Sequence, residues 1–211
     1  TTSLDGKATL TMAAADHNGS YAKDGEALQF QYMYQMNLNT SFTGDDNLYV
    51  RLRTGNGRVD SATEKGSFYE KTAFYHTDTY SGGVDSMKVD KIWYTFPIAN
   101  SEKFTGFIGP KIENYYMYAA PVSIYRPGFH KAFKLGSLSG AYGASTKTGF
   151  GIKYQGDSGF AWSSNLVSSG AGAAGILTNE DEYKWDTMLA YTKDQYHVSL
   201  TVSQQHEDWG S

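Results

Sequence analysis

Basic side chains recur at alternate positions in several segments of this 211-residue chain, and they are its most informative chemical groups. Alternate residues of an extended segment share one face, so these groups are expected to lie together. The basic residues at such positions are Lys7, Arg51, Arg53, Lys91, Lys111, Lys147, Lys153 and Lys184, and the acidic ones are Asp5, Glu113 and Asp186. Most other acids fall in expected turns and loops, although the formal net charge is −4. A row of fixed cations attracts anions; the alternative is that a wet face accepts any polar residue.

Catalysis and metal binding are not indicated by the sequence. The five histidines are scattered without the spacing of a zinc site, and there is no cysteine. His197 lies near Ser199 and Ser203, but no acid partner is arranged with them. The acids at 45–46 and 180–182 lack the spacing of a calcium loop. We therefore expect no enzyme activity, no metal and no cofactor, and the modest negative charge argues against a nucleic-acid partner.

The segment 28–38 alternates with a period of two, which predicts a strand. A turn rich in Gly, Asp and Asn follows, and residues 48–54 continue the alternation with Arg51 and Arg53 on the polar side, so the two arms form a hairpin. The apolar positions of the first arm are Leu28, Phe30, Tyr32, Tyr34, Met36 and Leu38, and its polar positions are Gln29, Gln31, Gln35, Asn37 and Asn39.

The same alternation predicts about nine strands in all. In the segment 103–114 it places Phe104, Ile108 and Ile112 on the apolar side and Lys111 on the polar side, and Pro110 predicts a bulge. Connections after every second strand are short and the others are longer, as in outer-membrane barrels. The strands expected outside the hairpin are 3–14, 88–98, 103–114, 145–154, 159–167, 182–192 and 195–203.

These features predict an all-β fold, an antiparallel transmembrane β-barrel with lipid outside and water inside. An alternating run of about fifteen residues exceeds the ~5–6 of a typical soluble strand and covers the ~9–11 that a membrane strand needs. The mean hydropathy of −0.50, without a long apolar run, excludes a transmembrane helix, and 17 Tyr suit aromatic girdles. Single-chain bacterial barrels have even strand numbers. We therefore expect residues 1–211 to be the N-terminal part of a larger barrel.

Three stretches resemble the porins of cyanobacterial outer membranes, a group related to carbohydrate-selective porins and often labelled iron-uptake porins. They are LNTSFTGDDNLYVRLRTGN (38–56), VDKIWYTFPIANSEKFTGFIGP (89–110) and YMYAAPVSIYRPGF (116–129). The resemblance implies an outer-membrane location, contact with the lipid bilayer and a homotrimer. Family members carry an N-terminal surface-layer-homology domain before the barrel. This sequence contains neither that domain nor the second half of the barrel, in keeping with the expected truncation.

The function expected from these features is passive diffusion of small hydrophilic solutes and inorganic ions through an outer-membrane porin. The alternative is a soluble or surface-attached β-sandwich that binds carbohydrate through exposed aromatic side chains. The two expectations differ in what the large aromatic residues face: lipid in the barrel, and sugar in the sandwich.

The connection 114–144 follows the fifth expected strand, and in general porins that loop folds into the barrel and narrows it. The connection holds Arg126, His130, Lys131 and Lys134 but no Asp or Glu. Folded inward, it would add cations to the lumen, so we expect a mild preference for small anions. The predicted constriction residues are Arg51, Arg53, Lys111, Arg126, Lys131, Lys134, Lys147 and Lys153.

Overall fold

The computed structural model describes residues 1–14, 28–56, 85–120, 146–170 and 175–206. These residues form one nine-stranded antiparallel sheet in which neighbours in the sequence are neighbours in space. The strands are β1 (Thr2–Ala13), β2 (Gln29–Thr40), β3 (Asn47–Gly55), β4 (Lys88–Ile98), β5 (Ser101–Glu113), β6 (Thr146–Gln155), β7 (Phe160–Ser168), β8 (Tyr183–Lys193) and β9 (Tyr196–Gln205). A 3₁₀ turn, η2 (Asn114–Met117), follows β5.

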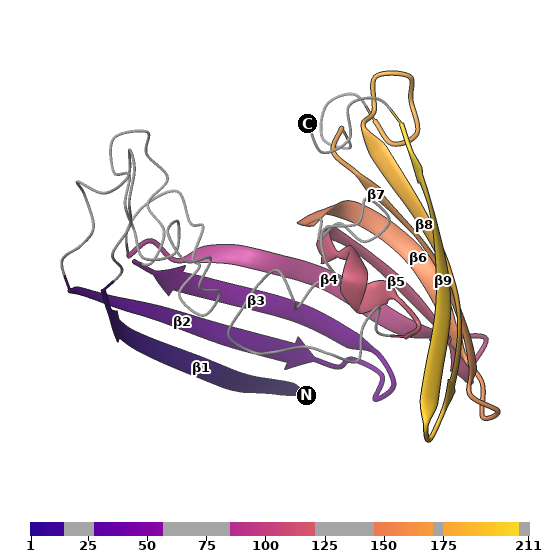
Figure 1. The fold of residues 1–211 in the computed structure, drawn as a ribbon, viewed down its shortest axis with the longest axis horizontal. Coiled ribbons are helices and arrows are strands. Elements are labelled where there is room, and N and C mark those ends of the chain that lie inside the picture. Colours follow the sequence, from indigo (N-terminus) through magenta and orange to yellow (C-terminus); the bar gives the residue numbers. More distant parts are fainter. Residues whose placement is uncertain (15–27, 57–84, 121–145, 171–174, 207–211) are drawn as a thin grey trace.

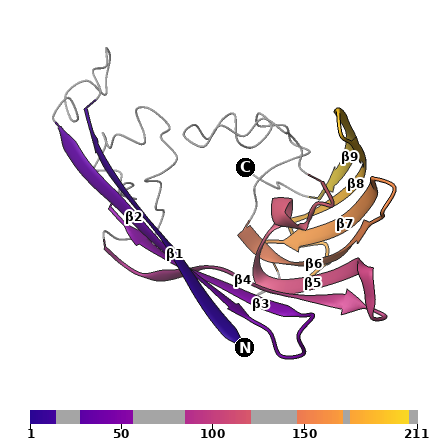
Figure 2. The ribbon, with the colours of Figure 1, turned by 90° about the horizontal axis from the view of Figure 1, so that it is seen from below.

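The sheet is strongly curved and open, with β1 and β9 as its edges (Figure 1). Seen from its end it is a trough, and η2 lies on the concave side (Figure 2). The all-β class and the nine expected strands are thus confirmed, while a closed barrel is not seen. The described residues form a single sheet, whereas a sandwich requires two. No helix in the described ranges is long and apolar enough to cross a membrane.

The two faces of the sheet differ in chemistry, as the alternation predicts. Cross-strand neighbours share a face, and the register links Leu38 to Val50 and Val50 to Ile92 on the convex face. On the other face it links Asn37 to Arg51 and Arg51 to Lys91. Exposed apolar side chains of the convex face are Leu4, Leu10, Met12, Phe30, Ile108, Phe150, Trp185, Leu189, Val198, Leu200 and Val202.

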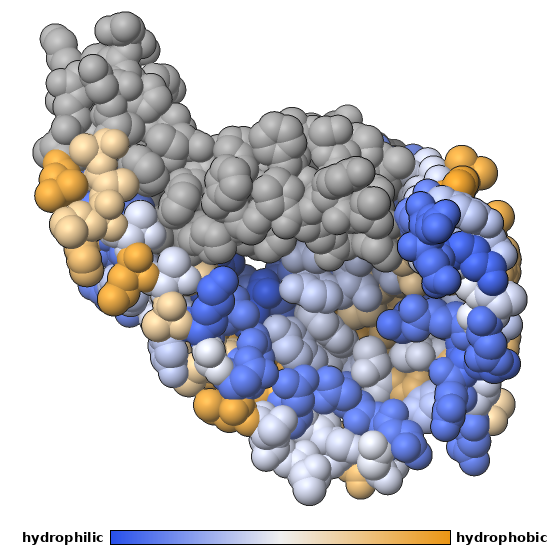
Figure 3. All heavy atoms as spheres, turned by 60° about the horizontal axis from the view of Figure 1, so that its bottom comes forward, coloured by the Kyte–Doolittle hydropathy of each residue, from blue (hydrophilic) through white to orange (hydrophobic). Residues whose placement is uncertain are grey.

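The opposite placement of Phe30 and Gln31 confirms the parity predicted for β2. Phe30 is 61% exposed on the convex face, whereas Gln31 is 5% exposed on the concave face. In Figure 3 hydrophilic residues gather in the hollow and near the turns, and hydrophobic residues lie at the outer margins. The convex face therefore exposes apolar side chains, whereas the concave face carries polar side chains together with buried apolar ones.

Connection lengths also follow the prediction. The turns after β2, β4, β6 and β8 are short, and the connections after β1, β3, β5 and β7 are longer. The tightest turns include Ala99 and Asn100, both with φ of 53°, the left-handed conformation that two-residue hairpin turns of the primed type require. Short turns thus lie at one end of the trough.

Bulges interrupt the register, and two of them affect the faces of charged residues. The β3–β4 pairing shifts between Arg51 and Leu52, so Asp90 and Lys91 of β4 both lie beside Arg51. In β5 the pairing with β6 shifts between Gly109 and Ile112, which confirms the bulge predicted at Pro110. A bulge inserts one extra residue and so exchanges the faces of the residues beyond it.

The bulge in β5 corrects the predicted faces of Lys111 and Ile112. Lys111 pairs with Ile92 of the convex face, and its Nζ donates to the carbonyl of Val89 at 3.0 Å. Ile112, expected on the apolar outer side, is fully buried in a concave-face cluster with Trp93, Phe107, Met117 and Val167. The prediction that Lys111 lines the hollow was therefore wrong, because simple alternation was carried across the bulge.

Asp46 organises the turn between β2 and β3. Its Oδ1 accepts hydrogen bonds from the backbone N–H groups of Phe42 and Thr43 at 3.0 and 2.8 Å, and its Oδ2 accepts one from the Tyr94 hydroxyl at 2.6 Å. The Ser41 and Thr43 hydroxyls donate to Oδ1 as well. These bonds, that of Tyr94 foremost, hold the pKa of Asp46 well below its ordinary value.

We expect Asp46→Asn to destabilise the hairpin at neutral pH. A lowered pKa in the folded state stabilises the fold above the unfolded value of ~3.9, and that contribution disappears as the pH falls through the folded pKa. Urea unfolding of wild type and variant should therefore differ most at pH 7 and converge only well below pH 4. If the difference in stability between wild type and Asp46→Asn grew as the pH fell, this role of Asp46 would be contradicted.

Gly151 on β6 offers a packing test. A Cβ at this position would lie 2.3 Å from Phe107 Cζ and 2.4 Å from the Ser164 carbonyl oxygen. We expect Gly151→Ala to lower the free energy of unfolding by about 1–3 kcal/mol through overpacking. Gly6→Ala is the control, since its Cβ would be no closer than 3.4 Å to its nearest neighbour, the Gln35 oxygen. Equal losses in urea unfolding of the two variants would contradict the predicted clash.

Candidate functional site

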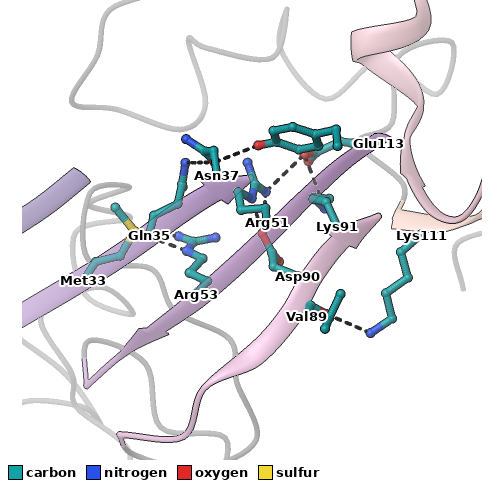
Figure 4. A network of polar contacts seen from close by, with 11 residues as sticks. Met33, Gln35, Asn37, Arg51, Arg53, Val89, Asp90, Lys91, Lys111 and Glu113 are labelled. Carbon is teal, nitrogen blue, oxygen red and sulfur yellow. Dashed lines mark hydrogen bonds and ion pairs between the residues drawn. The ribbon is translucent and has the colours of Figure 1, made fainter. Parts of the chain in front are cut away.

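Arg51 is the centre of a charge network on the concave face (Figure 4). Its Nη2 lies 2.5 Å from Asp90 Oδ2 and 3.4 Å from Glu113 Oε2, and Glu113 also lies 3.3 Å from Lys91 Nζ. The side chains of Arg51 and Lys91 are only 8% and 5% exposed. Two cations and two carboxylates thus form a nearly neutral, largely buried cluster that joins β3, β4 and β5.

Polar side chains extend this network towards β1. Asn37 Oδ1 accepts hydrogen bonds from the Tyr49 hydroxyl at 2.8 Å and from Gln35 Nε2 at 3.0 Å, while its Nδ2 donates to Asp5 Oδ1 at 2.5 Å. Arg53 contributes differently, because its Nε and Nη2 lie 3.2 and 3.0 Å from the Met33 sulfur. The concave face is therefore a connected polar surface from β1 to β5.

A second buried ion pair lies on β8. Lys184 Nζ is 3.4 Å from Asp186 Oδ2, and both side chains are fully buried. Asp186 Oδ2 also accepts hydrogen bonds from the Tyr118 hydroxyl at 2.7 Å and from Asn114 Nδ2 at 3.3 Å. This carboxylate therefore connects the wall of the trough to the chain that follows β5.

Residues 114–120, the inward segment, pack against the concave face. The backbone N–H of Ala119 donates to Ser163 Oγ at 3.1 Å, and Gln155 Nε2 donates to the carbonyl of Ala119 at 3.0 Å. Met117 and the residues 118–120 are buried, in two hydrophobic clusters against β4 to β8. The expectation that the connection after the fifth strand folds inward thus holds for its first, described part.

Aromatic rings help to hold this segment on the wall. The Tyr49 and Trp93 rings lie 4.4 Å apart between centroids, Trp93 and Tyr116 lie 5.6 Å apart, and Tyr115 and Tyr116 lie 4.5 Å apart. Offset and tilted pairs at these distances are favourable beyond the area they bury. The series joins β3 and β4 to η2.

The predicted constriction residues have different environments. Lys147 is exposed and Lys153 is half-buried, both at concave positions of β6, and neither forms an ion pair within the described residues. Arg51 is buried among acids, and Lys111 lies on the convex face. The remaining predicted residues, Arg126, Lys131 and Lys134, lie outside the described residues.

Sequence reasoning missed Asp90 as a partner of Arg51. Simple alternation puts Asp90 on the apolar side of β4 with Ile92, and only the bulge brings it to Arg51. The available signal was a charged residue, Asp90, at a position that alternation assigns to the apolar face. The role of Asp186 as an acceptor for Tyr118 had no such signal, because the two residues lie 68 positions apart.

No family model matches this chain, and no curated protein matches it.

We expect Glu113→Gln to destabilise the sheet by about 3 kcal/mol, because it removes the carboxylate shared by two largely buried cations. Glu182→Gln is the control, because Glu182 is exposed and its side chain accepts a 3.3 Å hydrogen bond from Ser169 Oγ. This variant should change the free energy of unfolding by no more than about 0.5 kcal/mol. Urea unfolding in detergent micelles measures both. If Glu113→Gln left the free energy of unfolding unchanged, Asp90 alone would be sufficient to compensate Arg51.

Proposed function

We propose that this chain forms the wall of a passive diffusion channel in a bacterial outer membrane, a porin for small hydrophilic solutes and inorganic ions. The observation that carries the proposal is that one curved antiparallel sheet exposes large apolar side chains on its convex face, while its concave face carries the charge network of Arg51 beside apolar clusters completed by the inward segment. Strands of 9 to 13 residues match the ~9–11 that a tilted membrane strand requires. Lipid would contact the outside of the curve and water the inside.

The few polar groups of the convex face support contact with lipid. Trp185 Nε1 donates to Ser164 Oγ at 2.8 Å, and Ser164 Oγ lies 3.2 Å from Thr187 Oγ1. These three groups satisfy one another, as polar groups facing hydrocarbon must, and Lys111 on the same face donates to the carbonyl of Val89. An equivalent face in water would need no such pairing.

The two open edges of the sheet, β1 and β9, would need partners in the proposed channel. In lipid, the backbone groups at β1 and β9 require pairing, because each unsatisfied group costs several kcal/mol. The proposed wall is therefore complete only when these edges are joined to further strands. The homotrimer and the relation to cyanobacterial porins rest on the sequence resemblance of residues 38–56, 89–110 and 116–129.

Selectivity would come from width and charge. The inward segment narrows the hollow and so limits solute size. Arg51, Lys91 and Lys184 are each paired with carboxylates, so their fields are largely cancelled. The proposed mild preference for anions therefore depends mainly on basic side chains such as Lys147 and Lys153.

The test is conductance in planar bilayers, using protein purified in detergent. We expect stepwise conductance and a reversal potential that indicates anion preference at ~0.1 M salt, fading as the Debye length shrinks from ~10 Å to ~3 Å at ~1 M. Lys147→Gln with Lys153→Gln should shift the reversal potential towards cations.

Lys111→Gln, on the convex face, is the matched control and should leave the reversal potential unchanged. Folded protein that gives no conductance steps would refute the channel. An effect of the Lys111 variant equal to that of the Lys147 and Lys153 variant would show that these side chains do not act from the hollow.

A further inference from the structure

Buried polar atoms without partners are concentrated on β7 to β9, close to the inward segment. Asn165, Asp186 and Ser203 are successive cross-strand neighbours on the concave face. Within the described residues, both amide atoms of Asn165, Oδ1 of Asp186 and Oγ of Ser203 have no hydrogen-bond partner, and Lys184 Nζ has only its ion pair with Asp186 Oδ2. Asn165 and Asp186 are 1% and 0% exposed. Native structures rarely leave so many neighbouring groups unsatisfied.

The inward segment makes contacts that favour this arrangement. Tyr118 and Asn114 donate to Asp186, Ala119 bonds to Ser163 and Gln155, and the side chain of Met188 is fully buried against residues 118–120. These contacts oppose the cost of keeping the nearby unsatisfied groups away from water. The two effects have opposite signs, so the unsatisfied groups reduce the free-energy advantage of the docked over the released segment.

We propose that residues 114–120 are a movable strap that exchanges between a docked position on Asp186 and a released position in which water reaches β7 and β8. Release would begin after Glu113, where β5 ends and the backbone leaves the sheet. The docked segment narrows the hollow, and its release would widen the hollow. The inference rests on the proposed channel only for this last consequence, since the exchange itself is a property of the wall.

Asp186 is the pivot of the exchange because it joins the strap to a buried cation. Asp186→Asn preserves an oxygen that accepts from Tyr118 but leaves the charge of Lys184 buried without a counter-ion, so the docked state loses stability. Adding Lys184→Met removes that charge. Replacing a buried pair with uncharged residues is often neutral or stabilising, so the double variant should dock again.

The experiment uses thiol labelling, which the absence of native cysteine makes unambiguous. Met188→Cys reports release, because its side chain is covered by the strap. Thr201→Cys, its half-exposed neighbour on β9, gives the rate for an accessible site, and Met33→Cys on β2 reports opening of the sheet as a whole. A water-soluble maleimide is added to protein in detergent, and the rates are measured by mass spectrometry.

We expect the Met188→Cys variant to be labelled more slowly than the Thr201 control and faster than the Met33 control. Asp186→Asn should raise the labelling rate at position 188 about tenfold or more without changing the Met33 control, and Lys184→Met should reverse that rise. Equal rates at positions 188 and 33 in every variant would overturn the strap, since only whole-sheet opening would then occur. A rise that Lys184→Met does not reverse would overturn Asp186 as the pivot. Because labelling requires no ion flow, a strap that moves in a protein without conductance would count against the channel alone.

Discussion

The hydrogen-bond register of the sheet decides which side chains lie on the concave face and which lie on the convex face. Because alternate residues face opposite ways, a shift of one residue exchanges every side chain beyond it. From β1 to β9 the ladder keeps the exposed apolar residues on the convex side, with shifts near Asp90 in β4 and at Pro110–Lys111 in β5. The shift near Asp90 brings that carboxylate to Arg51, which Glu113 reaches from the end of another strand, β5.

The features of the fold that depend on local alternation could be predicted from the sequence. The strands, their order of short and long connections and the faces of Phe30, Gln31 and Arg51 followed from the period of two. The faces of Lys111 and Ile112 did not, since proline predicts where a bulge occurs but alternation must then be restarted beyond it. The contact of Tyr118 with Asp186 depends on the curvature of the whole sheet, which no local pattern encodes.

Fewer basic side chains of the concave face could interact with mobile ions than their number suggests. A cation that is almost fully buried needs a nearby carboxylate, because desolvation would otherwise cost several kcal/mol. Arg51 and Lys184 meet that condition through Asp90, Glu113 and Asp186. Only side chains that retain contact with water, such as Lys147, are free to act on mobile ions. Burial thus separates cations that are paired within the sheet from those that remain in contact with water, even though both occupy the same parity.

The bulge in β5 also explains how the inward segment arises. If alternation had continued, Ile112 would face the convex side. The extra residue places Ile112 in the cluster of Trp93 and Phe107. Glu113, the last residue of β5, lies where the backbone leaves the sheet, and its carboxylate contacts Arg51. The next residues begin η2 already on the concave side, where Asn114 and Met117 are buried at once. One irregularity at Pro110 therefore removes Lys111 from the hollow and directs into it the segment that narrows it.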